Sequence, residues 1–143
     1  MVIRLGLLSF SDGRERVHAG LAPDIQAHAD RIKEILEQTG QIEVMLGAEI
    51  VHSAEVARAE ARRLDDLRLD GLVFNIPVFA FPNYSVIAAQ VACGPYLLLG
   101  PQDSRYPGLG GLLGAAGALT QAGIAHERIW ADLSDPGVPA QVL

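Results

Sequence analysis

"VIRLGLL", residues 2–8, is apolar at nearly every position. A strand with one solvated face alternates apolar and polar residues, whereas a strand covered by helices on both faces does not. The stretch therefore predicts a buried strand of a parallel sheet. Four later stretches predict further strands: IEVML (42–46), part of DGLVFNIPV (70–78), PYLLLG (95–100) and part of ERIWADL (127–133).

Helical patterns separate these strands. They cover residues 23–40, 53–67, 83–93 and 108–123. In the first of them Ile25, Ile32, Ile35 and Leu36 share one stripe, and Gly40 can supply the left-handed C-terminal cap. The second begins with Ser53 as a plausible N-cap. Its inward-facing residues are Val56, Leu64 and Leu67.

Strands that alternate with helices pair in parallel through right-handed crossovers. The pattern predicts an α/β fold, a five-stranded doubly wound parallel sheet that is flavodoxin-like with strand order 2-1-3-4-5. We expect this domain to span residues 1–135. Residues 136–143, with Pro139 in a first helical turn, predict the start of a truncated helix or a linker to missing domains. The alternative is an edge that stays uncovered or that a partner chain covers.

Composition excludes several classes of protein. The chain has 143 residues, fits one domain and carries a formal net charge of −6, which argues against a nucleic-acid partner. No stretch of about 20 apolar residues and no signal peptide are present, so we expect no membrane contact. The single cysteine, Cys93, is expected to be a buried structural thiol. One cysteine forms no internal disulfide, which suits a reducing compartment and predicts a cytoplasmic location.

In an open parallel sheet, ligands gather beyond the carboxyl ends of the strands, and the first such loop is SFSDGRER, residues 9–16. A dinucleotide site needs three glycines there, and only Gly13 is present. A flavin loop is matched in part by Ser9 and Ser11, but Asp12 would repel phosphate. A phospho-receiver domain needs an aspartate where Asn75 ends the third strand.

Other candidate features favour structural roles. The four-residue spacing of Gly110, Gly114 and Ala118 predicts a bare helix face for close packing. His28 and His126 are expected at the surface. His18 and His52 lie near strand ends, where a loop histidine is usually solvated. No spacing specifies a metal site, and no catalytic residues are assembled.

The third loop, within NIPVFAFPNYS (75–85), is rich in aromatic residues. Phe79, Phe81 and Tyr84 could stack on a sugar ring or a base. They could equally fill a hydrophobic gap or a subunit contact.

Together these stretches resemble the N-terminal domain of the L-fucose isomerase and L-arabinose isomerase family. The motifs that carry the resemblance are D-G-R at residues 12–14, the loop with Pro77, Phe79 and Phe81, and the P-G pair at 107–108 before the glycine-rich helix. The resemblance extends over nearly all of the chain.

The resemblance implies that the full-length protein is a ketol-isomerase that converts an aldose to a ketose through an ene-diol. It implies a divalent metal, usually manganese, held with the acid–base carboxylates in later domains, so that this fragment alone has no catalytic residue, cofactor or activity. It also implies a homo-oligomer in which the first domain contacts the sugar of a neighbouring subunit. By motif the sugar contacts are Arg14 and Phe79, with Asp12 and Gly13 in the same segment. Fucose isomerases proper tend to carry tryptophan where Phe79 stands, which leaves the sugar open.

Two other classes of function stay open from the residues alone. One is a small-ligand or flavin-binding module, and the other is a structural domain for oligomerisation, using residues 83–93 or the glycine-rich helix. For the first loop we expect Gly13 to give conformational freedom and Arg14 to sit at the mouth of the crevice rather than in an ion pair. The alternative is that Arg14 and Arg16 pair with Glu15 and Asp12 in water.

Overall fold

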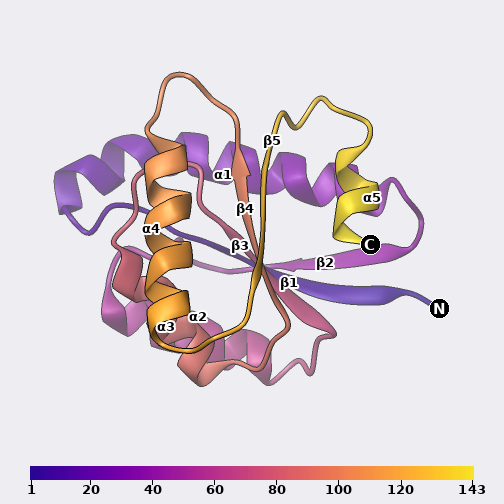
Figure 1. Ribbon diagram of the computed structural model, residues 1–143, viewed down its shortest axis with the longest axis horizontal. Coiled ribbons are helices and arrows are strands. Elements are labelled where there is room, and N and C mark those ends of the chain that lie inside the picture. Colours follow the sequence, from indigo (N-terminus) through magenta and orange to yellow (C-terminus); the bar gives the residue numbers. More distant parts are fainter.

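A computed structural model describes residues 1–143 and shows one parallel sheet. Its strands are β1 (Ile3–Ser9), β2 (Ile42–Leu46), β3 (Gly71–Asn75), β4 (Tyr96–Pro101) and β5 (Glu127–Ala131). All neighbouring strands pair in parallel, in the order β2-β1-β3-β4-β5 (Figure 1). The predicted fold class and strand order are confirmed.

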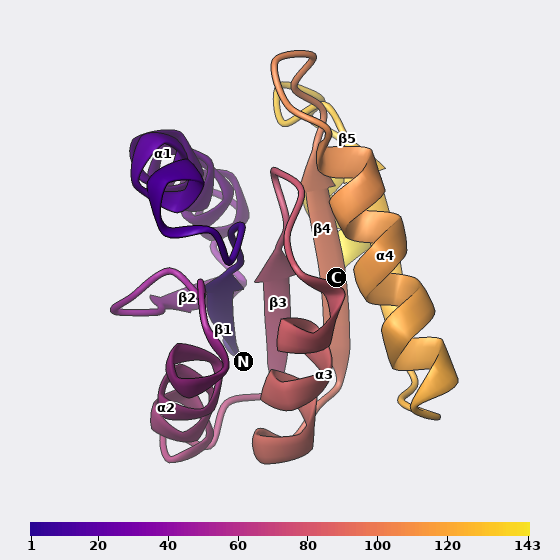
Figure 2. The same ribbon diagram turned by 90° about the vertical axis from the view of Figure 1, so that its left-hand side faces the viewer.

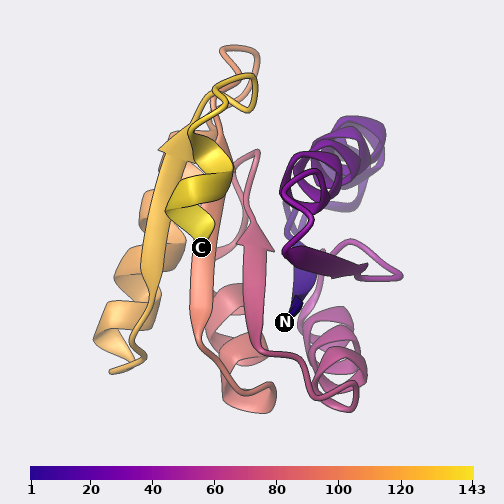
Figure 3. The same cartoon turned by 90° about the vertical axis from the view of Figure 1, so that its right-hand side faces the viewer.

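Helices cover both faces of the sheet. They are α1 (Glu15–Glu37), α2 (Ala54–Asp65), α3 (Pro82–Val91), α4 (Gly108–Gln121) and α5 (Val138–Val142). α1 and α5 lie on one face, and α2, α3 and α4 lie on the other (Figures 2 and 3). Because both faces are covered, a strand buries successive side chains on opposite sides, as Leu7 and Leu8 do in β1.

α1 begins eight residues earlier than the sequence predicted. Pro23 lies inside the helix. Proline lacks a backbone N–H and is therefore typical of the first turn of a helix, which is why the sequence predicted a start there. The helix continues through Pro23, and tertiary contacts lie on both sides of it. The ring of His18 stacks on His52, and the hydroxyl of Tyr106 donates a hydrogen bond to Asp24.

Two predicted burials are wrong. Leu67 follows α2 rather than ending it and is 38% exposed. Cys93 lies just after α3 and is exposed, while its backbone N–H donates to the Asp65 carboxylate at 2.9 Å. No helix combines the length and the hydrophobicity that crossing a bilayer requires.

α4 packs closely on the loop that follows β3 and on the start of α3. A Cβ added at Gly108 would lie 2.6 Å from the Pro77 carbonyl oxygen, and one at Gly111 would collide with the carbonyl of Val78. Of the predicted face, Gly110 faces open space, whereas a Cβ added at Gly114 would lie 3.2 Å from Pro82 Cγ, so the prediction holds only in part. The closest contact of α4 therefore fixes the backbone of the aromatic loop.

Candidate functional site

The segment that follows β1 is held by its neighbours on both sides. The Phe10 N–H donates to the Asn75 carbonyl at 3.0 Å, and the Ser11 N–H donates to the Val51 carbonyl at 2.8 Å. Ser11 and Asp12 are buried. The backbone at Phe10 and Ser11 therefore extends the sheet, and the exposed part of the loop begins only at Arg14.

Asp12 and Arg14 form a two-pronged ion pair. Arg14 Nε donates to Oδ1 of Asp12 at 2.9 Å, Nη2 donates to Oδ2 at 2.6 Å, and the Arg14 backbone N–H donates to Oδ1 at 2.8 Å. These bonds hold the pKa of the Asp12 carboxyl below its ordinary value, although burial opposes the shift. The expectation that Arg14 forms no ion pair is wrong.

The two partners of this pair differ in exposure. The Asp12 side chain is 2% exposed, whereas that of Arg14 is 67% exposed. A buried carboxylate thus fixes an exposed guanidinium at the carboxyl edge of the sheet. Two of its nitrogens face Asp12, and Nη1 stays free to donate outward.

Gly13 is required for space and not for conformational freedom, since its φ is not in the left-handed region. A Cβ at this position would collide with the hydroxyl of Tyr84 and lie 2.7 Å from the Phe81 ring. The D-G-R segment and the aromatic loop are therefore in direct contact.

The aromatic side chains form a row beside this segment. Phe81 stacks on Tyr84, with ring centroids 5.6 Å apart, and Phe79 meets Phe81 edge-on at 6.3 Å. Phe79 is 41% exposed, while Tyr84 is buried. The structure thus brings Asp12, Gly13 and Arg14 against Phe81 and Tyr84, and Phe79 extends the row into solvent.

His18 and His52 lie together at the same edge, which the sequence did not predict. Their rings are stacked at 16° with centroids 4.3 Å apart. Burial lowers the pKa of His18 below its ordinary value, with a further contribution from His52, while Glu49 acts in the opposite direction. The only sequence signal was that both residues follow strands that are neighbours in the sheet.

A second polar cluster links the loop after β4 to α1. Arg105 forms a two-pronged pair with Asp103, and His28 Nε2 lies 3.5 Å from Asp103 Oδ2. The hydrogen bonds from Arg105 lower the pKa of Asp103 to about 2. His28 is half-buried rather than fully exposed, and its Nδ1 is buried without a hydrogen-bond partner.

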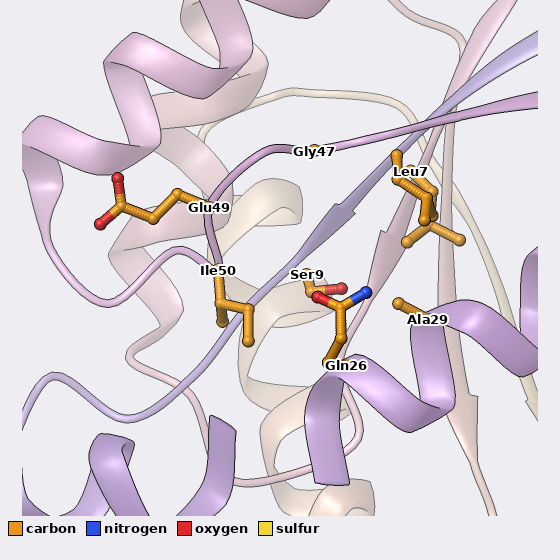
Figure 4. A pocket seen from close by; sticks show the side chains of 8 residues that line it. Leu7, Ser9, Gln26, Ala29, Gly47, Glu49 and Ile50 are labelled. Atoms are coloured by element: carbon orange, nitrogen blue, oxygen red, sulfur yellow. The ribbon is translucent and has the colours of Figure 1, made fainter. Parts of the chain in front are cut away.

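A small cavity lies between β1, α1 and the loop after β2. Its lining side chains, shown in Figure 4, are Leu7, Ser9, Gln26, Ala29, Leu46, Gly47, Glu49 and Ile50. Its volume of about 10 Å³ barely admits one water molecule. This cavity is too small for a sugar or a flavin and includes none of the predicted site residues.

No three histidine, cysteine or carboxylate side chains gather where they could hold a metal ion. The residues of this chain therefore do not fit a manganese site of their own. What the carboxyl edge offers is an oriented guanidinium, an exposed aromatic ring and a histidine pair.

The sheet and these loops define a flavodoxin-like α/β domain with a polar and aromatic surface at the carboxyl ends of its strands. The sequence match is more specific. Residues 2–143 match the family described as L-fucose isomerase, first N-terminal domain, and the chain belongs to that family. It is thus a sugar isomerase domain, as its motifs indicated. No curated protein sequence matches the chain.

Proposed function

We propose that this domain supplies sugar contacts to an aldose–ketose isomerase. Arg14 donates hydrogen bonds from its free Nη1 to substrate hydroxyls, and Phe79 packs against the sugar ring. The observation that carries the proposal is the fixed, exposed guanidinium of Arg14 on the buried carboxylate of Asp12, in a chain whose family match covers residues 2–143. Asp12 and Gly13 serve this contact by orienting Arg14 and by admitting the aromatic row.

In this proposal, other domains of the full-length protein carry out the chemical step. Ketol isomerisation needs a base, an acid and stabilisation of a developing oxyanion, which a divalent metal such as manganese supplies when bound. In this proposal the metal and the acid–base carboxylates come from other domains of the full-length protein. We therefore expect residues 1–143 alone, given manganese, to form no ketose from L-fucose or L-arabinose. Ketose formation by this chain would contradict the division of roles.

The proposed assembly is a cytoplasmic homo-oligomer in which this domain faces the active site of a neighbouring subunit. The support is the outer surface of α3 and α4. Neither helix carries a charged residue, and Leu109 and Leu113 are 43% and 51% exposed. Exposed apolar surfaces of this kind mark protein contacts. Light scattering that finds only monomers of the full-length protein at high concentration would contradict it.

The test of the sugar contact is Arg14→Ala in the full-length protein. We expect kcat/KM for the preferred aldose to fall about 100-fold, because a fixed donor to the reacting sugar is lost. Arg16→Ala is the matched control, since Arg16 is exposed and makes no ion pair. Phe79→Ala is expected to raise KM, and Phe79→Trp to retain binding. Unchanged kinetics in Arg14→Ala would reduce the D-G-R segment to a structural element.

A flavin-binding module is the second candidate, and Asp12 argues against it. A buried carboxylate occupies the loop where a flavin phosphate would have to bind. Titration with flavin mononucleotide is expected to show no micromolar binding, and a yellow protein as purified would favour this second candidate.

A further inference from the structure

The histidine pair is the strongest feature that the proposed function does not use. His18 comes from the start of α1, and His52 lies directly before the N-cap of α2, Ser53. Their nearly parallel rings, with centroids 4.3 Å apart, join the loop after β1 to the loop after β2. Neither residue belongs to the D-G-R segment or to the aromatic row.

Both histidines contact the surroundings of Arg14. His18 Nδ1 and the hydroxyl of Ser11 share a hydrogen bond of 2.9 Å, and Ser11 is fully buried directly before Asp12. On the other side, the hydroxyl of Tyr84 donates to the His52 carbonyl at 3.2 Å. Tyr84 in turn packs against Gly13. The contacts thus run in a closed circuit from Ser11 through both histidines and Tyr84 back to Gly13.

Burial and the neighbouring ring favour a neutral His18. Burial and the neighbouring His52 lower the pKa of His18, while Glu49 raises it. Glu49 Oε1 lies 3.3 Å from His52 Nε2. The other charged groups near the circuit are Asp12 and Glu55, which act on Tyr84, and Arg14, which Asp12 holds. Two protonated rings in a stack would repel each other, and the lowered pKa of His18 favours the neutral ring at that position.

We propose that the stacked pair of His18 and His52 positions Arg14 for the sugar by closing this circuit around Asp12 and Gly13. This inference rests on the proposed function, because the contact that it serves is that of Arg14. Both histidines are positioning residues in it. A misplacement of about 1 Å at a substrate contact can cost a large factor in rate, so the effect is measurable.

The experiment compares His52→Ala with His52→Phe in the full-length protein. Alanine removes the stacked ring, and phenylalanine keeps a ring that cannot titrate. We expect kcat/KM to fall about tenfold in His52→Ala and to stay within about twofold of wild type in His52→Phe. Hydrogen exchange at residues 10–14, followed by mass spectrometry, is expected to speed up only in the alanine variant. His126→Ala is the control, because His126 precedes β5 at the opposite edge of the sheet.

The outcomes distinguish the proposed sugar contact of Arg14 from the proposed positioning role of the histidine pair. Wild-type exchange and kinetics in His52→Ala would overturn the positioning role, as would equal losses in both His52 variants. If Arg14→Ala is fully active, the proposed sugar contact fails, and the exchange result still tests the circuit. If Arg14→Ala is impaired but His52→Ala is not, only the circuit fails. Should His52→Ala not fold, His52→Leu takes its place, because it is apolar but cannot stack.

A pH profile adds a readout that a purely structural role would not move. Below the ordinary histidine pKa of 6.5, wild-type kcat/KM is expected to fall as His18 becomes protonated, because burial disfavours the charged ring in the stack. His18→Asn can keep a hydrogen bond to Ser11 but does not titrate, so its profile is expected to be flatter over the same range. Parallel profiles for the two proteins would count against the circuit.

Discussion

The molecule contains the same short ion pair twice, in D-G-R at residues 12–14 and in D-S-R at 103–105. In each, the arginine backbone N–H and Nε both donate to Oδ1 of the aspartate, and Nη2 donates to Oδ2 at 2.6 Å. Both arginines are mostly exposed, at 67% and 63%. Their local geometry is therefore nearly identical.

The surroundings separate the two pairs. Arg105 is engaged further, since its Nη1 lies 3.9 Å from Asp24 and its guanidinium lies over the Tyr106 ring at 5.3 Å. These contacts tie the loop after β4 to α1. Arg14 keeps Nη1 free, with Phe81 and Tyr84 packed beside Gly13 and with His18 bonded to Ser11. A D-x-R turn thus has no function by itself. The surroundings of the arginine decide whether it ties two elements together, as Arg105 does, or stays exposed, as Arg14 does.

The largest difference between the two pairs is expected in turnover. Asp12→Asn removes the charge that holds Arg14 and places an amide N–H₂ or a neutral oxygen against the guanidinium. We expect kcat/KM of the full-length protein to fall at least tenfold, whereas Asp103→Asn changes it less than about twofold. Steady-state kinetics on both variants checks this. Similar losses in the two would show that the pairs are equivalent and that the comparison is wrong.

Substitutions of the middle residues of the two turns, Gly13 and Ser104, are expected to change the free energy of unfolding by different amounts. A methyl group at Gly13 collides with Tyr84 and Phe81, so Gly13→Ala is expected to lower the free energy of unfolding by about 1–3 kcal/mol. Ser104 is exposed, and Ser104→Ala is expected to stay within about 0.5 kcal/mol. Urea denaturation of both variants measures the difference. An unchanged free energy of unfolding in Gly13→Ala would mean that the Phe81 and Tyr84 side chains move to make room for the added methyl group.

The sequence predicted the fold because its strands are apolar throughout and helices separate them, which leaves few ways to connect a parallel sheet. The start of α1 was misplaced because Pro23 is a local signal, whereas the contacts that carry the helix past it come from His52 and Tyr106, far away in the sequence. Local sequence patterns therefore predicted which helices and strands form, but not every residue at which they begin or end.

The candidate site was predictable only in part, for a similar reason. Asp12, Gly13 and Arg14 are recognisable because they directly follow β1. The role of Gly13 and the stacking of His18 on His52 depend on which side chains of separate loops meet, and no spacing in the sequence encodes that. Cys93 and His28 were misjudged by residue type, since neither a typical cysteine nor a typical helix histidine describes their positions.

The smallest expected effect concerns pH. The region around His18 and the region around Asp103 are expected to lose their contributions to the free energy of unfolding at different pH values. Asp103 has its pKa lowered to about 2, so its contribution to stability is complete above the ordinary aspartate pKa of 3.8 and is lost as the pH falls toward 2. His18 also has a lowered pKa, but its ordinary value is 6.5. As the pH falls below that value, the unfolded chain takes up a proton on His18 before the folded chain does, and the folded state loses stability.

We therefore expect the region around His18 to lose stability near pH 6, and the region around Asp103 to lose stability only below about pH 4. The free energy of unfolding of wild type, relative to His18→Asn, is expected to fall between pH 7.5 and pH 5.5, by less than about 1 kcal/mol because solvent screens a partly exposed ring. Relative to Asp103→Asn, wild type is expected to show no change over that range and to lose stability only below pH 4. Denaturant unfolding at pH 7.5, 5.5 and 3 measures both differences. If wild type and His18→Asn respond alike down to pH 5.5, the stacked pair does not depend on a neutral His18, and the two regions differ only in their neighbours.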